Sequence, residues 1–270
     1  MNDDVNFLTK IVGFGNPLYF FYPLSIICLF VPKLLTFAFK IDKNMKYPSD
    51  FSAWSTQMTH TAFNLVRKKS LLSLDVWMSK AITPLSEWDM VSLKNTLLEI
   101  EDRARFWSES DIKMKLIGPA LIASRLDNLS FSSFAEVTLR TNLTTVKDEI
   151  IKVAGRPDII VAMGQYEASF PYFCMQEYKR QLKAKGDPQG QMLIELLAAR
   201  QINADAGNPL EVMYGAFTIG REWIFATLEG NQYALSKTFL LDVEPDLIEV
   251  TSRLRALKYI IADMIGITLP

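Results

Sequence analysis

Three side chains in the middle of the sequence have the types and spacing that phosphodiester chemistry requires. Asp158 follows Pro157, and Glu177 and Lys179 stand two positions apart in a run that starts at the apolar Tyr172. A buried strand does not readily accept a carboxylate and an ammonium group. Because residues i and i+2 of a strand point to the same face, we expect Glu177 and Lys179 to lie side by side.

A pair of neighbouring strands would bring the carboxylate of Asp158 beside that of Glu177, where the two charges repel each other. A divalent cation between them removes this cost, and oxygen ligands favour Mg²⁺ or Mn²⁺. Such a cation supplies Lewis-acid chemistry, and Lys179 is placed to orient water or to stabilise a phosphoryl group. The trio therefore predicts a metal-dependent phosphodiester-cleaving site, with an inert salt-bridged hairpin as the alternative.

The composition excludes several other kinds of site. His60 is the only histidine in 270 residues, so a zinc site built on histidines and a Ser-His-Asp triad are both disfavoured. The two cysteines, Cys28 and Cys174, lie in apolar runs and predict no disulfide framework, which indicates a reducing, cytoplasmic compartment. The net charge of −1 predicts no global basic surface for nucleic acid, so any such binding must use a local patch.

The amino-terminal region is strongly apolar, since residues 11–39 carry a single charge, Lys33. This length meets the requirement for a membrane span, although three prolines interrupt it. If it spans a membrane, the lysines on its carboxyl side would keep the rest of the chain in the cytoplasm as an anchored domain. The alternatives are an arm packed on the domain, an arm buried in a homodimer, or a translation start at Met45.

The remaining sequence predicts an α/β protein with a helical amino-terminal region. Residues 1–45 form the apolar arm, residues 46–106 show helical spacing, and residues 107–270 form the main domain. That domain begins with a helix and continues with several strands, a helix near 188–202, more strands, and a final helix over 245–265. We expect a mixed sheet flanked by helices.

The helix that begins near residue 108 carries another candidate acid. Glu109 lies one turn before Ile112, on or beside the apolar face, whereas Asp111 lies on the wetter side. Stabilisation of the helix dipole is the alternative explanation for both acids. The spacing of Asp111 and Lys113 repeats that of Glu177 and Lys179, but it falls within a helix and is interpreted as a coincidence.

The sequence resembles the PD-(D/E)xK, or restriction-endonuclease-like, nucleases, and in particular one bacterial branch of that superfamily. Pro157-Asp158 followed by Glu177-Tyr178-Lys179 is similar to the superfamily signature. Pro245-Asp246 repeats the PD pair, but at a helix start. The resemblance covers roughly residues 107–236, and the matching segments are WSESDIKMKLIGPAL, GRPDIIVAMG, PYFCMQEYK, DPQGQMLIELLAA, YGAFTIGREWIF and LEGNQYALS.

The resemblance implies a restriction-endonuclease-like core and a role for each site residue. Asp158, Glu177 and Glu109 would bind Mg²⁺ or Mn²⁺, and Lys179 would be the catalytic lysine. Gln191 would support the site from the following helix, although this chain has Glu195 one turn later, where certain relatives carry tyrosine. The implied activity is a magnesium-dependent nuclease acting on DNA.

The alternative function is an inactive module that binds nucleic acid or a protein partner, with the apolar arm as a membrane contact. The clustering of two acids and a lysine argues against this alternative, because a pure binding module has no use for it. Lys183 and Lys185, after the second strand, are either contacts to a phosphate backbone or solvated side chains.

Overall fold

The computed structural model describes residues 46–100, 103, 106–179 and 186–269. From Tyr47 onward the chain forms one compact unit. The apolar arm at 1–45, with the membrane contact predicted for residues 11–39, lies outside the described residues, as do Lys183 and Lys185. Among the helices that are described, none combines the length and apolar character needed to cross a membrane.

The unit contains helices and strands in mixed order. The helices are η2 (Phe51–Ala53), α2 (Thr56–Phe63), α3 (Leu72–Ser79), α4 (Glu87–Ile100), α5 (Glu109–Ile112), the π-helical turn η4 (Lys113–Ile117), α6 (Gly118–Ser124), α7 (Pro188–Asp205) and α8 (Glu244–Ile265). The strands are β1 (Val66–Lys68), β2 (Phe131–Ala135), β3 (Leu139–Thr144), β4 (Ile150–Gly155), β5 (Ile159–Met163), β6 (Ser169–Lys179), β7 (Val212–Ile219), β8 (Glu222–Glu229), β9 (Gln232–Leu235) and β10 (Phe239–Leu240).

The main sheet is mixed, as the sequence predicts. Its strand order is β1-β9-β8-β7-β6-β5-β2, with β10 paired to β8, and β3 and β4 form a separate hairpin. β6 is parallel to β7 and β1 is parallel to β9, whereas the other pairs of the main sheet are antiparallel. The parallel pair β6–β7 needs a crossover, and α7 supplies it.

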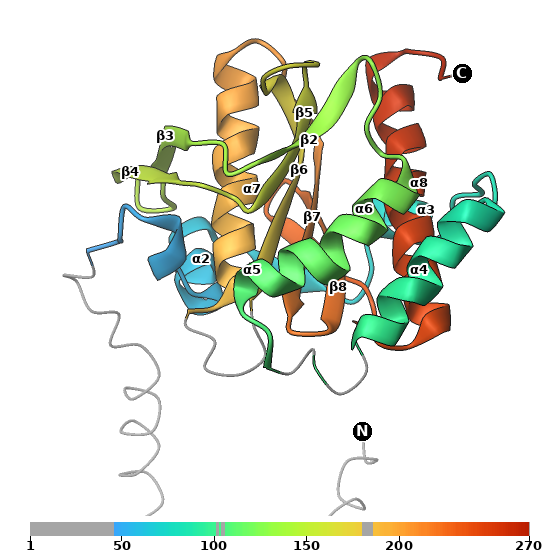
Figure 1. Ribbon diagram of the computed structural model, residues 1–270. Helices are drawn as coiled ribbons and strands as arrows, with labels where there is room; N and C mark the ends of the chain where they lie inside the picture. Colours follow the sequence, from blue (N-terminus) through green and yellow to red (C-terminus); the bar gives the residue numbers. More distant parts are fainter. Residues whose placement is uncertain (1–45, 101–102, 104–105, 180–185, 270) are drawn as a thin grey trace, which may run out of the picture. The chain divides into compact units, whose positions relative to one another are not determined.

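Helices cover both faces of the sheet (Figure 1). On one face, α2, α7 and the β3–β4 hairpin enclose one apolar core. On the other face, α3, α4, α6 and α8 enclose the second core. The prediction of an α/β protein with a mixed sheet between helices is confirmed.

α7 is the crossover helix that lies behind the candidate site, and its start is fixed by local chemistry. Asp187 caps it by accepting a hydrogen bond from the amide of Gly190, and Pro188 occupies the first turn. The other oxygen of Asp187 accepts a hydrogen bond from the amide of Thr56, which ties α2 to the same point. A Cβ on Gly190 would lie 2.3 Å from the backbone of Thr56, so only glycine permits this approach.

The helical region that precedes the main domain belongs to the same cores. Phe51 and Trp54 pack in the core beneath α7, while Trp77 and Leu93 pack in the core on the opposite face. The region also contains β1, a three-residue edge strand that helical spacing did not predict. Residues 47–100 therefore complete the main sheet and both of its faces.

Candidate active site

The β5–β6 hairpin brings Asp158 next to Glu177. In the antiparallel register Ile159 pairs with Gln176, so the residues that flank this pair, Asp158 and Glu177, are neighbours. The amide of Tyr178 donates a 2.7 Å hydrogen bond to Oδ2 of Asp158, which fixes the carboxylate against β6. The predicted placement of the PD aspartate beside the glutamate agrees with this geometry.

Lys179 lies two residues beyond Glu177, on the same face of β6, and its ammonium group joins two acids. It forms a short ion pair with Oε1 of Glu177. Its Nζ also lies 3.8 Å from Oε1 of Glu109, at the start of α5. Glu109 is thus brought to the hairpin by a different element, as the sequence predicts.

Glu109 is positioned by a well-defined helix start. Ser108 caps α5 by accepting a hydrogen bond from the amide of Asp111, and the side chain of Asp111 accepts one from the amide of Ser108. Asp111 also pairs with Lys115, at 2.7 Å. Its role is therefore in capping the helix, whereas Glu109 faces the site.

Lys113 is a member of the site that the sequence did not identify. Its Nζ lies 2.5 Å from Oδ1 of Asp158 and 4.0 Å from Oε1 of Glu109. It begins the π-helical turn η4, and turns of this kind are frequent at functional sites. The sequence interpretation set Lys113 aside because its spacing from Asp111 lies within a helix. The sequence pattern that indicates Lys113 is its position one turn after Glu109, because side chains at i and i+4 lie on the same side of a helix.

The site is closed from behind by two residues of α7. Gln191 donates a 3.1 Å hydrogen bond from Nε2 to Oε1 of Glu195, and both side chains are buried. The charge of Glu177 acts on Glu195 and helps to raise its pKa, so α7 belongs to the same electrostatic cluster. Gln191 thus contacts Glu195, the acid that the sequence places one turn later, and its supporting role stays a prediction.

Burial in a cluster of acids perturbs the site strongly. Glu177 is 1% exposed, and this burial, together with the nearby charge of Asp158, raises its pKa to about 7 despite the ion pair with Lys179. Burial, followed by the charge of Glu177, raises the pKa of Glu195 well above its usual range. For Lys179, burial acts to lower the pKa, but the charge of Glu177, its hydrogen bond to Glu177, and the charges of Glu109 and Asp158 together outweigh burial, so the pKa is raised.

Two carboxylate oxygens at the centre of the cluster have unmet hydrogen-bonding capacity. Oε2 of Glu177 and Oε2 of Glu195 are buried and accept no hydrogen bond from any residue that the structure describes. A buried acceptor without a partner is costly for stability. Buried polar groups without partners and pKa values perturbed by burial and charge are both typical of functional sites.

The donor chemistry of Glu109, Asp158 and Glu177 fits a hard cation, because all three offer carboxylate oxygens and Oε2 of Glu177 is unengaged. In the arrangement observed, Lys113 and Lys179 neutralise the acids instead. Within the described ranges, no three Asp, Glu, His or Cys side chains are grouped as a metal site. The donor atoms are thus of the type that Mg²⁺ or Mn²⁺ prefers. In this structure the ammonium groups of Lys113 and Lys179 balance the charge of the acids.

The second PD pair has a structural role, as the sequence indicated. Pro245 and Asp246 lie in the first turn of α8, and Oδ2 of Asp246 accepts a hydrogen bond from the amide of Leu240. Arg221 and Trp223, in another segment of the resemblance, are also structural. Arg221 pairs with Asp242, and Trp223 is fully buried in the core.

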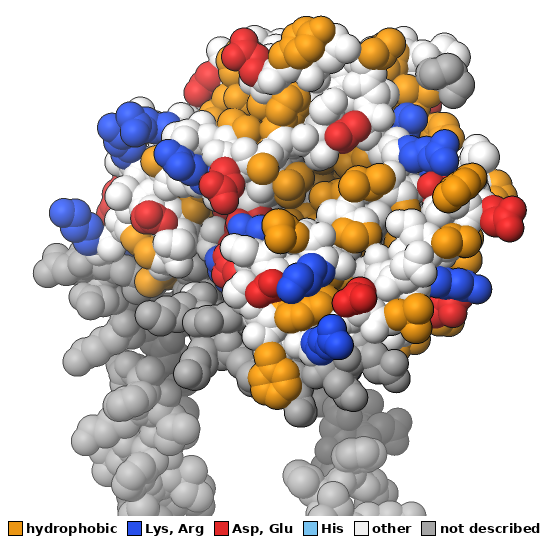
Figure 2. Space-filling model, viewed as in Figure 1, with side chains coloured by type: hydrophobic (Ala, Val, Ile, Leu, Met, Phe, Trp, Pro, Cys, Tyr) orange, Lys and Arg blue, Asp and Glu red, His pale blue; other side chains and the backbone are white. Residues whose placement is uncertain are grey.

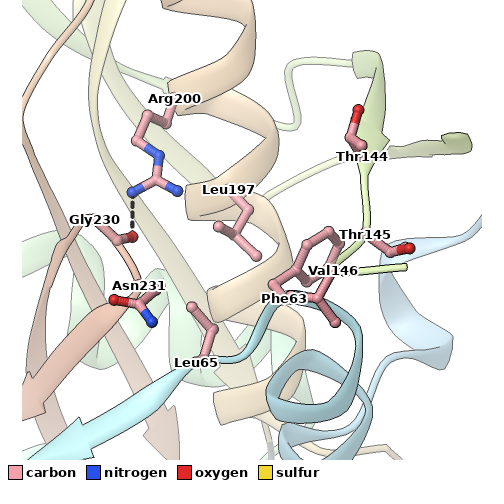
Figure 3. Close-up of a pocket in the computed structure, with 9 residues that line it drawn as sticks. All are labelled: Phe63, Leu65, Thr144, Thr145, Val146, Leu197, Arg200, Gly230 and Asn231. Atoms are coloured by element: carbon pink, nitrogen blue, oxygen red, sulfur yellow. Dashed lines mark hydrogen bonds between the residues drawn. The ribbon is translucent and has the colours of Figure 1, made fainter. Parts of the chain in front are cut away.

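A separate hollow lies farther along α7 (Figure 3). Phe63, Leu65 and Leu197 contribute apolar walls, and the guanidinium of Arg200 donates a hydrogen bond to the carbonyl of Gly230. None of the residues that line the hollow belongs to the carboxylate–lysine cluster. We therefore assign it no part in the chemistry of the candidate site.

Comparison with known proteins adds no further constraint on the site. No protein-family model matches the chain, and no curated protein is significantly similar to it. The functional argument accordingly depends on the geometry and on the resemblance in the motif segments.

Proposed function

We propose that the protein is a metal-dependent nuclease with a restriction-endonuclease-like core. One observation carries the proposal: Glu109, Asp158, Glu177 and Lys179, predicted as a set from the sequence, lie in one network of ion pairs and charge interactions. They come from the start of α5, the start of β5 and the end of β6. In α/β proteins, ligands commonly bind at the carboxyl ends of parallel strands, and β6 pairs in parallel with β7.

Hydrolysis of a phosphodiester adds the oxygen of water to phosphorus and breaks one phosphorus–oxygen ester bond. Negative charge develops on the phosphoryl oxygens and on the leaving oxygen. Lys179, whose side chain is 15% exposed and is held by Glu177, offers a fixed positive charge for those oxygens. Lys113, fixed by Asp158, offers a second one.

Glu109, Asp158 and Glu177 would hold Mg²⁺ or Mn²⁺, which when bound supplies the Lewis acidity for attack on phosphorus. The positive charges of Lys113 and Lys179 keep these acids close together in its absence. On α7, Gln191 donates a hydrogen bond to Glu195, whose pKa is raised in part by the charge of Glu177. We take DNA as the substrate, as the resemblance implies.

The test is cleavage of plasmid DNA by the purified protein with Mg²⁺ or Mn²⁺. We expect nicking or cutting that falls by at least about 100-fold in Asp158→Ala and in Lys179→Ala, because each removes a charge at the reacting centre. Lys115→Ala is the matched control. Among the residues that the structure describes, Lys115 forms an ion pair only with Asp111, and its ammonium group lies over the ring of Trp107, so the activity should stay within about twofold.

Thermal unfolding of each variant separates loss of chemistry from loss of fold. If the wild-type protein leaves duplex DNA, single-stranded DNA and RNA intact with either metal, the proposal is wrong. The same conclusion follows if folded Asp158→Ala cleaves as fast as the wild-type protein.

A second candidate is a module that binds nucleic acid or a protein without cleaving it. The observation in its favour is that Lys113 and Lys179 already neutralise the acids that would bind the cation. Calorimetric titration distinguishes the two functions. Heat of Mn²⁺ binding that disappears in Asp158→Ala supports the nuclease, whereas no binding to the wild-type protein supports the module.

A further inference from the structure

Helix α4 (Glu87–Ile100) has two apolar faces, and only one is used within the described chain. Leu93 and Ile100 are buried against the domain. On the opposite side, Trp88 is 84% exposed, Leu98 is 73% exposed, and Val91 is also exposed. Hydrophobic side chains are visible over this part of the surface in Figure 2.

The exposed residues follow a regular spacing. Trp88, Val91, Asn95 and Leu98 stand at positions i, i+3, i+7 and i+10, and all four are exposed. This is the spacing of the a and d positions of a coiled coil over two heptads. The buried residues Leu93 and Ile100 then fall at the f position, which points away from a partner helix.

We infer that this stripe, consisting of Trp88, Val91, Asn95 and Leu98, joins two copies of the chain through a parallel pair of α4 helices. In a parallel pair, each a position faces the same residue of the other copy. Asn95 would therefore face Asn95, and a side-chain amide is both a donor and an acceptor. In an antiparallel pair it would face an apolar d position, which leaves its amide unpaired at a cost.

The charges beside the stripe are complementary in the same arrangement. With Trp88 at a, Lys94 falls at a g position and Glu99 at the e position five residues later. In a parallel pair, g faces the e position of the next heptad on the other helix. Within one chain, Lys94 lies 3.5 Å from Glu244 and Glu99 lies 3.6 Å from Arg103, and both ion pairs are solvent-exposed. In the dimer Lys94 of each copy would exchange this partner for Glu99 of the other, which gives two ion pairs related by the twofold axis.

Site-specific crosslinking tests the pairing in the full-length chain kept in solution with a mild detergent. In a Cys28→Ser background, Asn95→Cys should form a disulfide-linked dimer on oxidation. Asn142→Cys, which is exposed on β3 and outside α4, should crosslink at least about tenfold more slowly. No dimer from Asn95→Cys, or equal crosslinking at both positions, overturns the inference.

A charge exchange provides an independent test by analytical ultracentrifugation. We expect Lys94→Glu and Glu99→Lys each to weaken the dimer by about three- to tenfold, because each replaces attraction by repulsion across the pair. The double variant should recover wild-type association. If instead the stripe is covered by residues 11–39 of the same chain, Trp88→Glu and the charge variants will leave association unchanged, and the inference fails.

Discussion

Glu177 lies where an acid destabilises the folded protein, and this cost is what the proposed chemistry requires. Its side chain is buried beside Asp158, and its pKa is raised to about 7. In the unfolded chain the same group titrates near its ordinary value of about 4.5. Between these two values the folded state holds more protons than the unfolded state, so the free energy of unfolding falls as the pH rises.

This difference predicts how Glu177→Gln changes stability. The glutamine does not titrate, so the variant should become more stable relative to wild type between pH 5 and pH 8, by about 2 kcal/mol. Urea unfolding in the presence of a chelator measures the effect. Glu211→Gln, an exposed substitution outside the cluster, should follow the wild-type curve. Parallel pH curves for Glu177→Gln and the wild-type protein would contradict the prediction.

Three of the site residues could be identified from the sequence because they lie on, or directly before, neighbouring strands, where alternation along the chain predicts which side chains share a face. Glu177 and Lys179 alternate along β6, and Asp158 is reached through the hairpin that joins β5 to β6. Lys113 and Glu195 could not be placed in this way, because each lies on a helix and contributes only through tertiary packing. Each is one turn beyond a residue that was identified, Glu109 or Gln191, and so lies on the same side of its helix.

At the scale of elements, one buried guanidinium joins α8 to the helices beside it. Arg255 donates to Asp89 of α4 and to four backbone carbonyls, those of Thr83, Pro84, Ala123 and Ser124. All three nitrogens of its side chain are engaged in this way. Burial acts to raise the pKa of Asp89, but hydrogen bonds from Ser86, Arg255 and Arg125 outweigh it and lower the pKa to about 2.

Arg255→Ala should therefore be strongly destabilising, by about 3–5 kcal/mol, because it leaves Asp89 and the carbonyls without their buried donor. Thermal unfolding should show a decrease in Tm of about 10 °C or more. The lowered pKa of Asp89 also predicts that the wild-type protein loses stability as the pH falls from about 4 to 2. Arg255→Ala should lose less over this range.

Arg140→Ala is the matched control, because Arg140 is exposed on β3. It should change Tm by no more than about 2 °C. An Arg255→Ala variant as stable as this control would show that the network contributes little.

The elements themselves were largely predictable, because their signals are local. Asp187-Pro188 marks the start of α7, and the apolar spacing of α8 runs from Leu247 to Ile261 as observed. β1 and β10 were not predicted. They are three and two residues long, and their strand conformation depends on pairing with β9 and β8. A local sequence pattern does not predict such pairing.

At the scale of the molecule, the question is whether the helical region before residue 107 folds apart from the sheet. The sequence places a boundary there, but aromatic packing crosses it. The ring of Trp77 lies 4.7 Å from that of Phe225 and 5.2 Å from that of Tyr214, centre to centre, in the core of the sheet. Its indole nitrogen donates to the carbonyl of Arg253 in α8.

Two fragments that differ only in this region test whether residues 46–270 fold as one cooperative unit. A fragment of residues 46–270 keeps both cores and should unfold in one cooperative transition. A fragment of residues 107–270 lacks Trp54, Trp77 and Leu93, each of which is about 1% exposed or less, and should show no cooperative transition. Losing even one buried tryptophan costs about 3–5 kcal/mol, a large part of the stability of a typical domain. Cooperative unfolding of 107–270 at the Tm of the longer fragment would show instead that residues 107–270 fold independently.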